Sequence, residues 1–323
     1  MTQKLFVFPL LIFVMSGPQK CENPIVVLGG IGEDGPVRHV ETLWPGYDDG
    51  FDNSGYFVDH LFDPVDSIPD LGYYDFMGSS AVLLDSTTIM SCGGYPSKAE
   101  CYGLDLHNGS WFSMPPMKNG RSEFSLLKVG DRVYAIGGDN VEVFDAESKS
   151  WTEVFQLQPA RSRHCSVVVG DQQVLIFGGA SSATLNLTTL IDTKTGNFTN
   201  LEPMPVGRYA AGCLKWTLND QDGVMITGGV DLLSSSSSAF PANYVDFFSL
   251  DSLSWTRLAD SSYGQWDHKM VVHDTYEVSE ETRSPRPIII GGEYELLDET
   301  GMRETHYRNT VFKSDTDIGI VVM

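Results

Sequence analysis

The stretch VYAIGGDNVEVFDAESKSWTEV, residues 133–154, decides the fold. An apolar run ends in Gly137-Gly138, a second apolar run ends at Asp145, and Trp151 follows six residues later. Short apolar runs bounded by glycines and polar turn residues are typical of β-strands joined by tight turns. Whether this stretch is a single hairpin or one copy of a repeated unit determines the architecture of the whole chain.

The glycine pair recurs behind an apolar run at six places. These pairs are Gly29-Gly30, Gly93-Gly94, Gly137-Gly138, Gly178-Gly179, Gly228-Gly229 and Gly291-Gly292. A self-similar period of about 50 residues is the sequence signature of a repeat architecture. The chain is therefore predicted to contain six related units.

Other residues recur in register with the glycine pairs. An aromatic residue stands six positions after the end of the following strand, at Trp111, Trp151, Phe198 and Trp255. An arginine opens a further strand ahead of three of the pairs, at Arg121, Arg161 and Arg208. Each unit is thus expected to hold four strands: one after the arginine, one ending in the glycine pair, one ending in Asp or Ser, and one carrying the aromatic residue.

This set of residues resembles the kelch repeat, from about residue 25 to the C-terminus. The resemblance implies an all-β fold over residues 25–323, a six-bladed kelch-type β-propeller with four-stranded antiparallel blades. Packing such sheets face to face around an axis buries both faces of each sheet. The glycines allow positive φ and close backbone approach. The tryptophan supplies a flat surface between blades, with an N–H that can reach a backbone carbonyl.

How the ring closes is left open by the sequence. The first unit has no arginine-headed strand, so residues 318–323 either fill that place or form the outer strand of the last unit. Alignment of 311–322 with 247–258 favours the outer strand, whereas alignment of 294–299 with 141–146 favours closure.

The N-terminal residues have the layout of a secretory signal peptide. Lys4 precedes an apolar run over 5–15, and the small residues Ser16 and Gly17 follow. A run of about 11 residues is too short to cross ~30 Å of hydrocarbon. We therefore expect a signal peptide over 1–16, a short lead over 17–24, and a secreted, monomeric chain without a membrane span. The alternative is a buried N-terminal strand.

Cysteines and sequons fit an oxidising compartment. Asn108, Asn186 and Asn197 each stand in an Asn-x-Ser/Thr sequon and are expected to be N-glycosylated. Cys92 and Cys101 are expected to form a disulfide, because they lie on neighbouring strands joined by a short loop. Cys165 and Cys213 lie in arginine-headed strands of consecutive units, one position apart when aligned on the arginine, and are expected to be free and buried. The pairing of Cys21 is left open.

The charge narrows the class of partner. The chain of 323 residues has 43 acidic and 21 basic residues, a formal net charge of −22. Such a surface repels phosphate backbones and anionic lipid, because binding them requires Lys or Arg in place of counterions. Nucleic acid and membrane surfaces are therefore excluded, and the expected partner is a protein or glycan that is basic or bridged by a cation.

No catalytic, cofactor or metal motif is recognisable, so none of these sites is expected. Asp48, Asp49 and Asp52 are potential calcium ligands, but their spacing does not fit an EF-hand loop, and a solvated acidic loop is the preferred interpretation. His164 stands where other units have Phe124 and Ala211, which indicates a packing position rather than a ligand.

Two classes of function remain. The first is a secreted interaction module that binds a macromolecule through loops on one rim, drawn from the long insertions 44–72, 230–243, 275–286 and 293–308. The alternative is a propeller enzyme of the oxidase or hydrolase type, with a site assembled across blades. A carboxylate–histidine cluster with shifted pKa values would favour the enzyme.

Overall fold

The structure is a computed structural model that describes residues 12–14, 25–32, 35–43, 77–232, 239–258, 260, 261, 264–273, 286–290, 292–297, 303–307 and 311–312. Every regular element within these ranges is a β-strand, and the paired strands run antiparallel. The all-β class predicted from the glycine spacing is therefore confirmed for the described part of the chain.

Three sheets have the four-stranded order expected of one unit. The first contains β4 (Ser79–Asp85), β5 (Thr88–Gly93), β6 (Cys101–Asp105) and β7 (Trp111–Met114). The second contains β11 (Cys165–Gly170), β12 (Gln173–Phe177), β13 (Thr188–Asp192) and β14 (Phe198–Asn200). The third contains β15 (Gly212–Leu218), β16 (Gln221–Thr227), β19 (Val245–Ser249) and β20 (Trp255–Arg257). In each sheet the hydrogen-bonded order follows the order of these strands along the chain.

The unit around Trp151 follows the same course with fewer breaks. It consists of β8 (Ser125–Val129), β9 (Arg132–Asp145) and β10 (Ser150–Arg161). One guanidinium nitrogen of Arg121 contacts the carbonyl oxygens of both Gly137 and Asn140, which an extended strand would hold far apart. The chain therefore turns back inside β9 at the glycine pair, and β9 supplies both the second and the third segment of its unit.

An aspartate precedes three of the four aromatic residues and caps the turn between the third and fourth segments. The side chain of Asp145 accepts hydrogen bonds from the backbone N–H groups of Glu147 and Ser148, at 3.1 and 2.8 Å. Asp105 and Asp192 accept equivalent bonds from the backbone two residues on. This Asx turn brings the chain back as an antiparallel strand and so fixes the spacing from Asp to the aromatic residue.

The core lies between neighbouring sheets. Val82 and Met90 of one sheet belong to the same buried cluster as Val133 and Phe144 of the next. Trp151 completes this cluster, and its indole N–H donates to the carbonyl of Pro115 at 3.0 Å. The predicted role of the tryptophan, a flat surface between sheets with a satisfied N–H, is confirmed at this position.

Two further aromatic positions show the same packing. Trp255 contacts both Phe248 of its own sheet and Phe177 of the preceding one, with ring centroids 5.0 and 5.5 Å apart. Its N–H donates to the carbonyl of Glu202. Phe198 takes the tryptophan position in its unit and packs edge-to-face on Phe155.

The glycine pairs mark the junctions between units. Gly93 has φ +73°, and a Cβ placed there would lie 2.6 Å from the carbonyl oxygen of Arg121, in the next unit. The N–H of Gly94 donates to that same carbonyl at 2.9 Å. Close approach between units, together with a left-handed backbone, therefore explains why glycine recurs here. Gly291 lies outside the described residues.

The first unit departs from the pattern. In β2 (Ile25–Gly32) the strand continues through Gly29-Gly30 with a register shift at this point, and pairs with β3 (Gly35–Leu43). The glycine pair therefore lies within a hairpin strand rather than at its end. The other edge of β2 pairs with β1 (Ile12–Val14), which falls inside the segment predicted as a signal peptide. The signal peptide over 1–16 stays a prediction.

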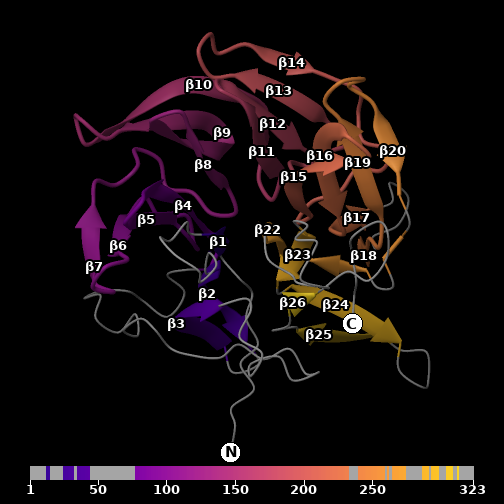
Figure 1. The fold of residues 1–323 in the computed structure, drawn as a ribbon, viewed down its shortest axis with the longest axis horizontal. Helices are drawn as coiled ribbons and strands as arrows, with labels where there is room; N and C mark the ends of the chain where they lie inside the picture. The colour runs from indigo at the N-terminus through magenta and orange to yellow at the C-terminus, as the bar shows by residue number, and fades with distance from the viewer. Residues whose placement is uncertain are drawn as a thin grey trace, which may run out of the picture.

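The sheets are arranged around a common centre, with the first strand of each unit innermost (Figure 1). Around this centre β8 lies beside β4 and β11, and β15 lies beside β11 and β22. In turn β22 (Lys269–His273) lies beside β1. The arrangement of four-stranded antiparallel sheets is consistent with a β-propeller.

The strand pairing of the last unit tests the two alignments of the C-terminal residues. Here β22 pairs with β23 (Arg286–Ile290), and β23 pairs with β26 (Val311–Phe312). The third strand is therefore at 311–312, and the alignment of 294–299 with a third strand is wrong. That segment instead forms the hairpin of β24 (Glu293–Leu297) and β25 (Arg303–Tyr307), which pairs with β21 (Gln265–Trp266). Residues 318–323 lie outside the described residues.

Candidate functional site

Backbone hydrogen bonds link five consecutive units around the centre. The linked residues each stand just before an innermost strand: Gly78, Glu123, Arg163, Ala210 and Asp267. The N–H of each of the last four donates to the carbonyl of the residue before it in this series, at 2.6, 2.8, 2.8 and 2.8 Å. All five have φ between +52° and +69°, the left-handed conformation that aims the N–H and C=O at the neighbouring units. We call this series the axial ladder.

The axial ladder defines one face of the molecule. The glycine pairs lie at the same end of the sheets, because Gly93 pairs with Ser79 at the start of β4. The hairpin of β17 (Val230–Leu232) and β18 (Ala239–Pro241), inserted between β16 and β19, also rises from this end. We call this end the ladder face, and the opposite end, which carries the Asx turns, the turn face.

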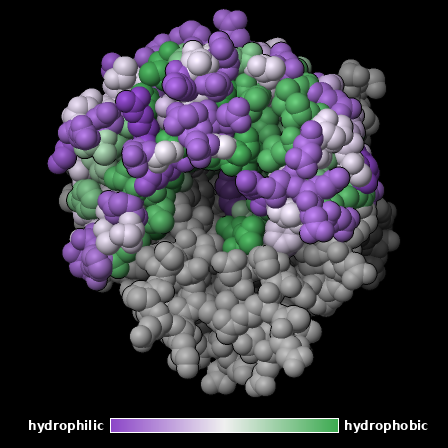
Figure 2. Space-filling view, turned by 45° about the horizontal axis from the view of Figure 1, so that its top comes forward, coloured by the Kyte–Doolittle hydropathy of each residue, from purple (hydrophilic) through white to green (hydrophobic). Residues whose placement is uncertain are grey.

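Charged side chains of both signs lie at the axial ladder. Arg163 forms an ion pair with Glu123, and each of these side chains keeps about a third of its surface exposed, 38% and 34%. The Arg163 guanidinium lies over the ring of Tyr209, 5.6 Å from its centroid. The carboxylate of Glu123 raises the pKa of Arg163, so the cation persists at any physiological pH. Figure 2 shows a hollow at the centre of the sheets, with both hydrophilic and hydrophobic residues around it.

Asp267 and Lys269 bring a second pair of charges to the centre. Burial raises the pKa of Asp267, and the positive charges of Arg163 and Lys269 oppose that rise. Desolvation lowers the pKa of Lys269, while the negative charge of Asp267 opposes the change. Glu123, Arg163, Tyr209, Asp267 and Lys269 therefore form one mixed-charge cluster on successive units, which we call the mouth cluster.

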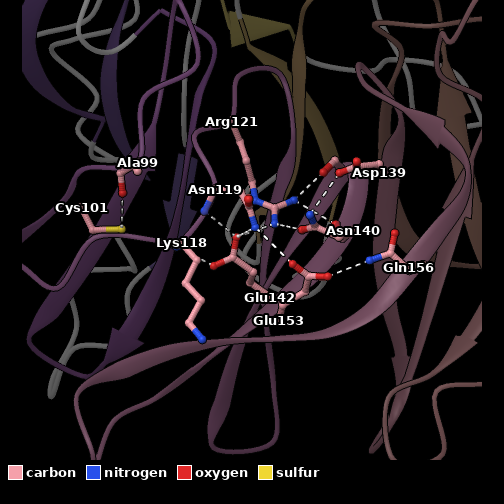
Figure 3. Close-up of polar contacts among 11 residues, drawn as sticks. Ala99, Cys101, Lys118, Asn119, Arg121, Asp139, Asn140, Glu142, Glu153 and Gln156 are labelled. Carbon is pink, nitrogen blue, oxygen red and sulfur yellow. Dashed lines mark hydrogen bonds and ion pairs between the residues drawn. The ribbon is translucent and has the colours of Figure 1, made fainter.

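A second polar layer holds the units together behind the mouth cluster. Arg121 donates to the carboxylate of Glu142 at 2.7 Å, and the two side chains are 4% and 0% exposed. Glu142 also accepts hydrogen bonds from the backbone N–H groups of Lys118 and Asn119, at 2.7 and 3.0 Å (Figure 3). Burial raises the pKa of Glu142, but the hydrogen bonds from Arg121 and this backbone outweigh it and lower the pKa overall. The layer is structural, because it is closed to solvent.

Two histidines of the described part of the chain are buried packing residues. His164 and His268 stand at the same position of their units, and their Nε2 atoms pair with the hydroxyls of Ser125 and Thr227, at 3.1 and 2.7 Å. Burial lowers the pKa of each to about 3, so both rings are neutral. The packing role predicted for His164 fits its burial and its hydroxyl partner.

Clusters with metal-binding composition are absent from the part of the chain that the structure describes: no three His, Cys, Asp or Glu residues come together there. Asp48, Asp49 and Asp52 lie outside that part. The carboxylate–histidine cluster that would favour an enzyme is likewise not found among the described residues.

Both disulfides involve cysteines that the sequence singled out. Cys92 and Cys101 face each other on β5 and β6 and are bonded, with Cα atoms 4.1 Å apart, as predicted. Cys165 and Cys213 are also bonded, with Cα atoms 6.0 Å apart, so the prediction that they are free is wrong. The one-position offset excludes contact between strands paired in a single sheet. The offset does not exclude contact between β11 and β15. These are the innermost strands of adjacent sheets, and their side chains meet between the two sheets.

The sequons lie on exposed residues. Asn108 and Asn197 lie in the turns before β7 and β14, on the turn face, and Asn186 lies in the connection between β12 and β13, on the ladder face. Exposure of all three asparagines is compatible with N-glycosylation.

The long insertions do not share one rim. Residues 230–243 and 293–308 join a second strand to a third, at the ladder face. His273 and Arg286, which flank 274–285, are paired at the opposite end of β22 and β23, so this insertion leaves from the turn face. Residues 44–72 lie outside the described residues.

The mouth cluster was not found from the sequence. Three of its five residues, Glu123, Arg163 and Asp267, stand two positions after Arg121, Arg161 and the equivalent Gln265, a position occupied by different residue types in each unit. The repeat register itself was the available signal, because any residue two positions after the recurring arginine reaches the centre.

The comparisons with known proteins agree with this architecture. No protein-family model matches the chain. Over 175 residues it is 29% identical to Kelch-like protein 36 of Bos taurus, covering 50% of this chain and 26% of the relative. Over 113 residues it is 29% identical to Kelch repeat and BTB domain-containing protein 2 of cowpox virus (strain Brighton Red), covering 32% of this chain and 20% of the relative.

A relative with a different kind of name matches as well. Over 132 residues the chain is 31% identical to tRNA wybutosine-synthesizing protein 4 of Candida albicans, covering 34% of this chain and 19% of the relative. The matches thus span only about a fifth to a quarter of the length of these relatives. The kelch-named relatives, at about 30% identity, support a kelch-repeat assignment for the chain.

Proposed function

We propose that the chain is a secreted, six-bladed kelch propeller that binds a protein partner through the ladder face and has no catalytic activity of its own. The six glycine pairs and the ring of innermost strands support six blades. Relatives named as kelch proteins support an interaction module. Two disulfides and three exposed sequons support an oxidising, extracellular environment.

The mouth cluster is the observation that carries the proposal. Glu123, Arg163 and Asp267 of this cluster stand in the axial ladder, whose backbone hydrogen bonds do not depend on the identity of their side chains. Gly78 and Ala210 show this directly, because they hold the same place in the axial ladder without a charged side chain. Charges that the fold does not need, at a partly exposed centre, are best explained by recognition.

The net charge of the chain indicates the charge of the partner. A net charge of −22 attracts basic or cation-bridged proteins and accelerates their encounter. Steering of this kind weakens as salt screens the charges, over a Debye length of about 8 Å at physiological ionic strength. Binding is therefore expected to be salt-dependent.

The test replaces the mouth charges with the residue that Ala210 already provides. The variant Glu123→Ala, Arg163→Ala, Asp267→Ala keeps the backbone ladder and removes three charged side chains. The control replaces two exposed residues of the turn face, Glu147→Ala and Lys194→Ala. Wild type and both variants are used to capture partners from tissue extract, followed by mass spectrometry and a titration of the captured protein.

We expect the mouth variant to bind the captured partner at least about ten-fold more weakly and the control to bind as wild type does. Equal binding by wild type and the mouth variant, with both correctly folded, would place the interface elsewhere and overturn this part of the proposal.

One observation favours an enzyme as the second candidate. The pKa of Asp267 is raised and that of Lys269 is lowered, and shifted pKa values cluster at functional sites, active sites among them. The relative named as a wybutosine-synthesizing protein also points to an enzyme, although the match spans 19% of its length. Turnover of a small substrate that is abolished by Lys269→Met would support the enzyme. Partner capture by the same variant would leave the binding proposal standing.

A further inference from the structure

Three units place side chains at the same three positions in the same relation to one another. The recurring arginine reaches a residue of the third strand, which pairs in register with a residue of the fourth. These triads are Arg121–Glu142–Glu153, Arg161–Thr189–Asn200 and Arg208–Asp246–Arg257. They can be compared directly, because the chain supplies the matched controls.

In two triads the buried arginine is neutralised by a carboxylate. Arg121 lies 2.7 Å from Glu142, and Arg208 lies 2.7 Å from Asp246. Arg208 and Asp246 are both 0% exposed, and Asp246 also receives Arg257 at 2.5 Å. A carboxylate at the third-strand position is thus the solution that the fold uses twice.

The third triad has no carboxylate. Thr189 stands at the position of Glu142 and Asp246, and its hydroxyl accepts from Arg161 Nη2 at 3.3 Å while donating to Asn200 at 3.2 Å. Arg161 is only 2% exposed, and its Nη1 has no hydrogen-bond partner among the described residues. Burial lowers the pKa of Arg161, and no carboxylate of the described residues acts to restore it.

An unpaired guanidinium in this environment calls for a counter-ion. Arginine does not lose its proton in proteins, so the charge cannot be removed by titration. A buried charge without a partner costs several kcal/mol, because neither water nor an opposite charge compensates for the loss of hydration.

We infer that the Arg161–Thr189–Asn200 triad binds a small monovalent anion, chloride under physiological conditions, against Nη1 of Arg161. The anion takes the role that the side-chain carboxylates of Glu142 and Asp246 have in the other two triads. An exposure of 2% leaves no path for a peptide carboxylate or a glycan, which restricts the ligand to a single small ion. The inference does not depend on the function proposed for the mouth cluster.

The experiment measures thermal unfolding of the full secreted chain against chloride concentration. Sodium gluconate replaces sodium chloride so that ionic strength stays constant. Wild type should show a saturable rise in the unfolding midpoint of about 2 to 4 °C, since an ion that binds only the folded state stabilises it. Bromide should act in the same way.

Two variants separate this site from general salt effects. Thr189→Asp reproduces the residue found at Asp246, supplies the missing charge internally, and should make the midpoint independent of chloride. Thr152→Asp adds the same charge at an exposed position of the preceding unit, outside the triad, and should keep the chloride response. An equal response of wild type and Thr189→Asp would overturn the inference.

A second measurement holds even if Thr189→Asp does not fold. Crystals of the wild-type protein soaked in bromide should give an anomalous peak within about 3.5 Å of Arg161 Nη1, with no such peak at Arg121 or Arg208. A water molecule there, with bromide density absent, would likewise overturn the assignment.

Discussion

The guanidinium of Arg121 donates to the carboxylate of Glu142 across 2.7 Å, in a place where neither side chain is more than 4% exposed. Removing one member of such a pair leaves an uncompensated buried charge. We expect Glu142→Gln to lower the free energy of unfolding by about 3 to 5 kcal/mol, measured by urea denaturation.

The matched control is Glu147→Gln, an exposed residue in the Asx turn of the same unit. Its effect should stay within about 0.5 kcal/mol. Similar losses in the two variants would mean that the Arg121–Glu142 pair is not what stabilises this unit.

The neutral histidines predict a loss of stability in mild acid. His164 has a folded pKa of about 3, against about 6.5 when unfolded, so between these values only the unfolded chain binds the proton. The stabilisation is complete above pH 6.5 and is lost progressively as the pH falls towards 3. His164→Phe, which copies Phe124, should reduce the slope of unfolding free energy against pH by up to about 1.4 kcal/mol per pH unit.

Denaturation curves at pH 7, 6 and 5 check this, because the shifted carboxylate of Glu142 titrates at lower pH. An unchanged slope in His164→Phe would show that this ring is protonated in the folded state.

Truncation of Trp151 should be costly. The side chain is 3% exposed, packs on Phe144 at 5.2 Å between ring centroids, and donates to Pro115. We expect Trp151→Ala to cost about 3 to 5 kcal/mol in chemical denaturation. Phe112→Ala serves as the control because that ring is 45% exposed, and a comparable cost there would contradict the packing role assigned to Trp151.

Peptide mapping without reduction should recover two linked pairs, Cys92 with Cys101 and Cys165 with Cys213. The second bond joins the innermost strands of adjacent sheets, so its loss should affect stability across that junction. Alkylation of all four cysteines in native protein would contradict both assignments.

The first residue of the mature chain distinguishes two assignments of the apolar run 5–15, as a signal peptide or as a strand. Secretion predicts a first residue near Gly17, whereas the structure pairs Ile12–Val14 with β2. An uncharged, apolar segment can serve either as a signal peptide or as a strand. We expect N-terminal sequencing of secreted protein to begin near Gly17, and a cytosolic chain beginning at Met1 would instead favour the strand.

The repeating parts of this fold were predictable because local chemistry repeats with them. Glycine at Gly93 and the Asx turn at Asp145 each answer a backbone requirement that recurs in every regular unit. The Cys165–Cys213 bond was missed because it depends on how innermost strands approach between sheets, which a register within one sheet does not describe. The mouth cluster was missed because residues as different as Glu123 and Ala210 occupy one structural position.

That last property gives the axial ladder a practical use. Five positions around one opening are connected through main-chain atoms and already tolerate glycine, alanine, two acids and an arginine. A combinatorial library over Gly78, Glu123, Arg163, Ala210 and Asp267 would therefore vary the lining of the opening while leaving the scaffold that carries it intact. The same chain could in this way be selected for new targets, with specificity chosen independently of foldability.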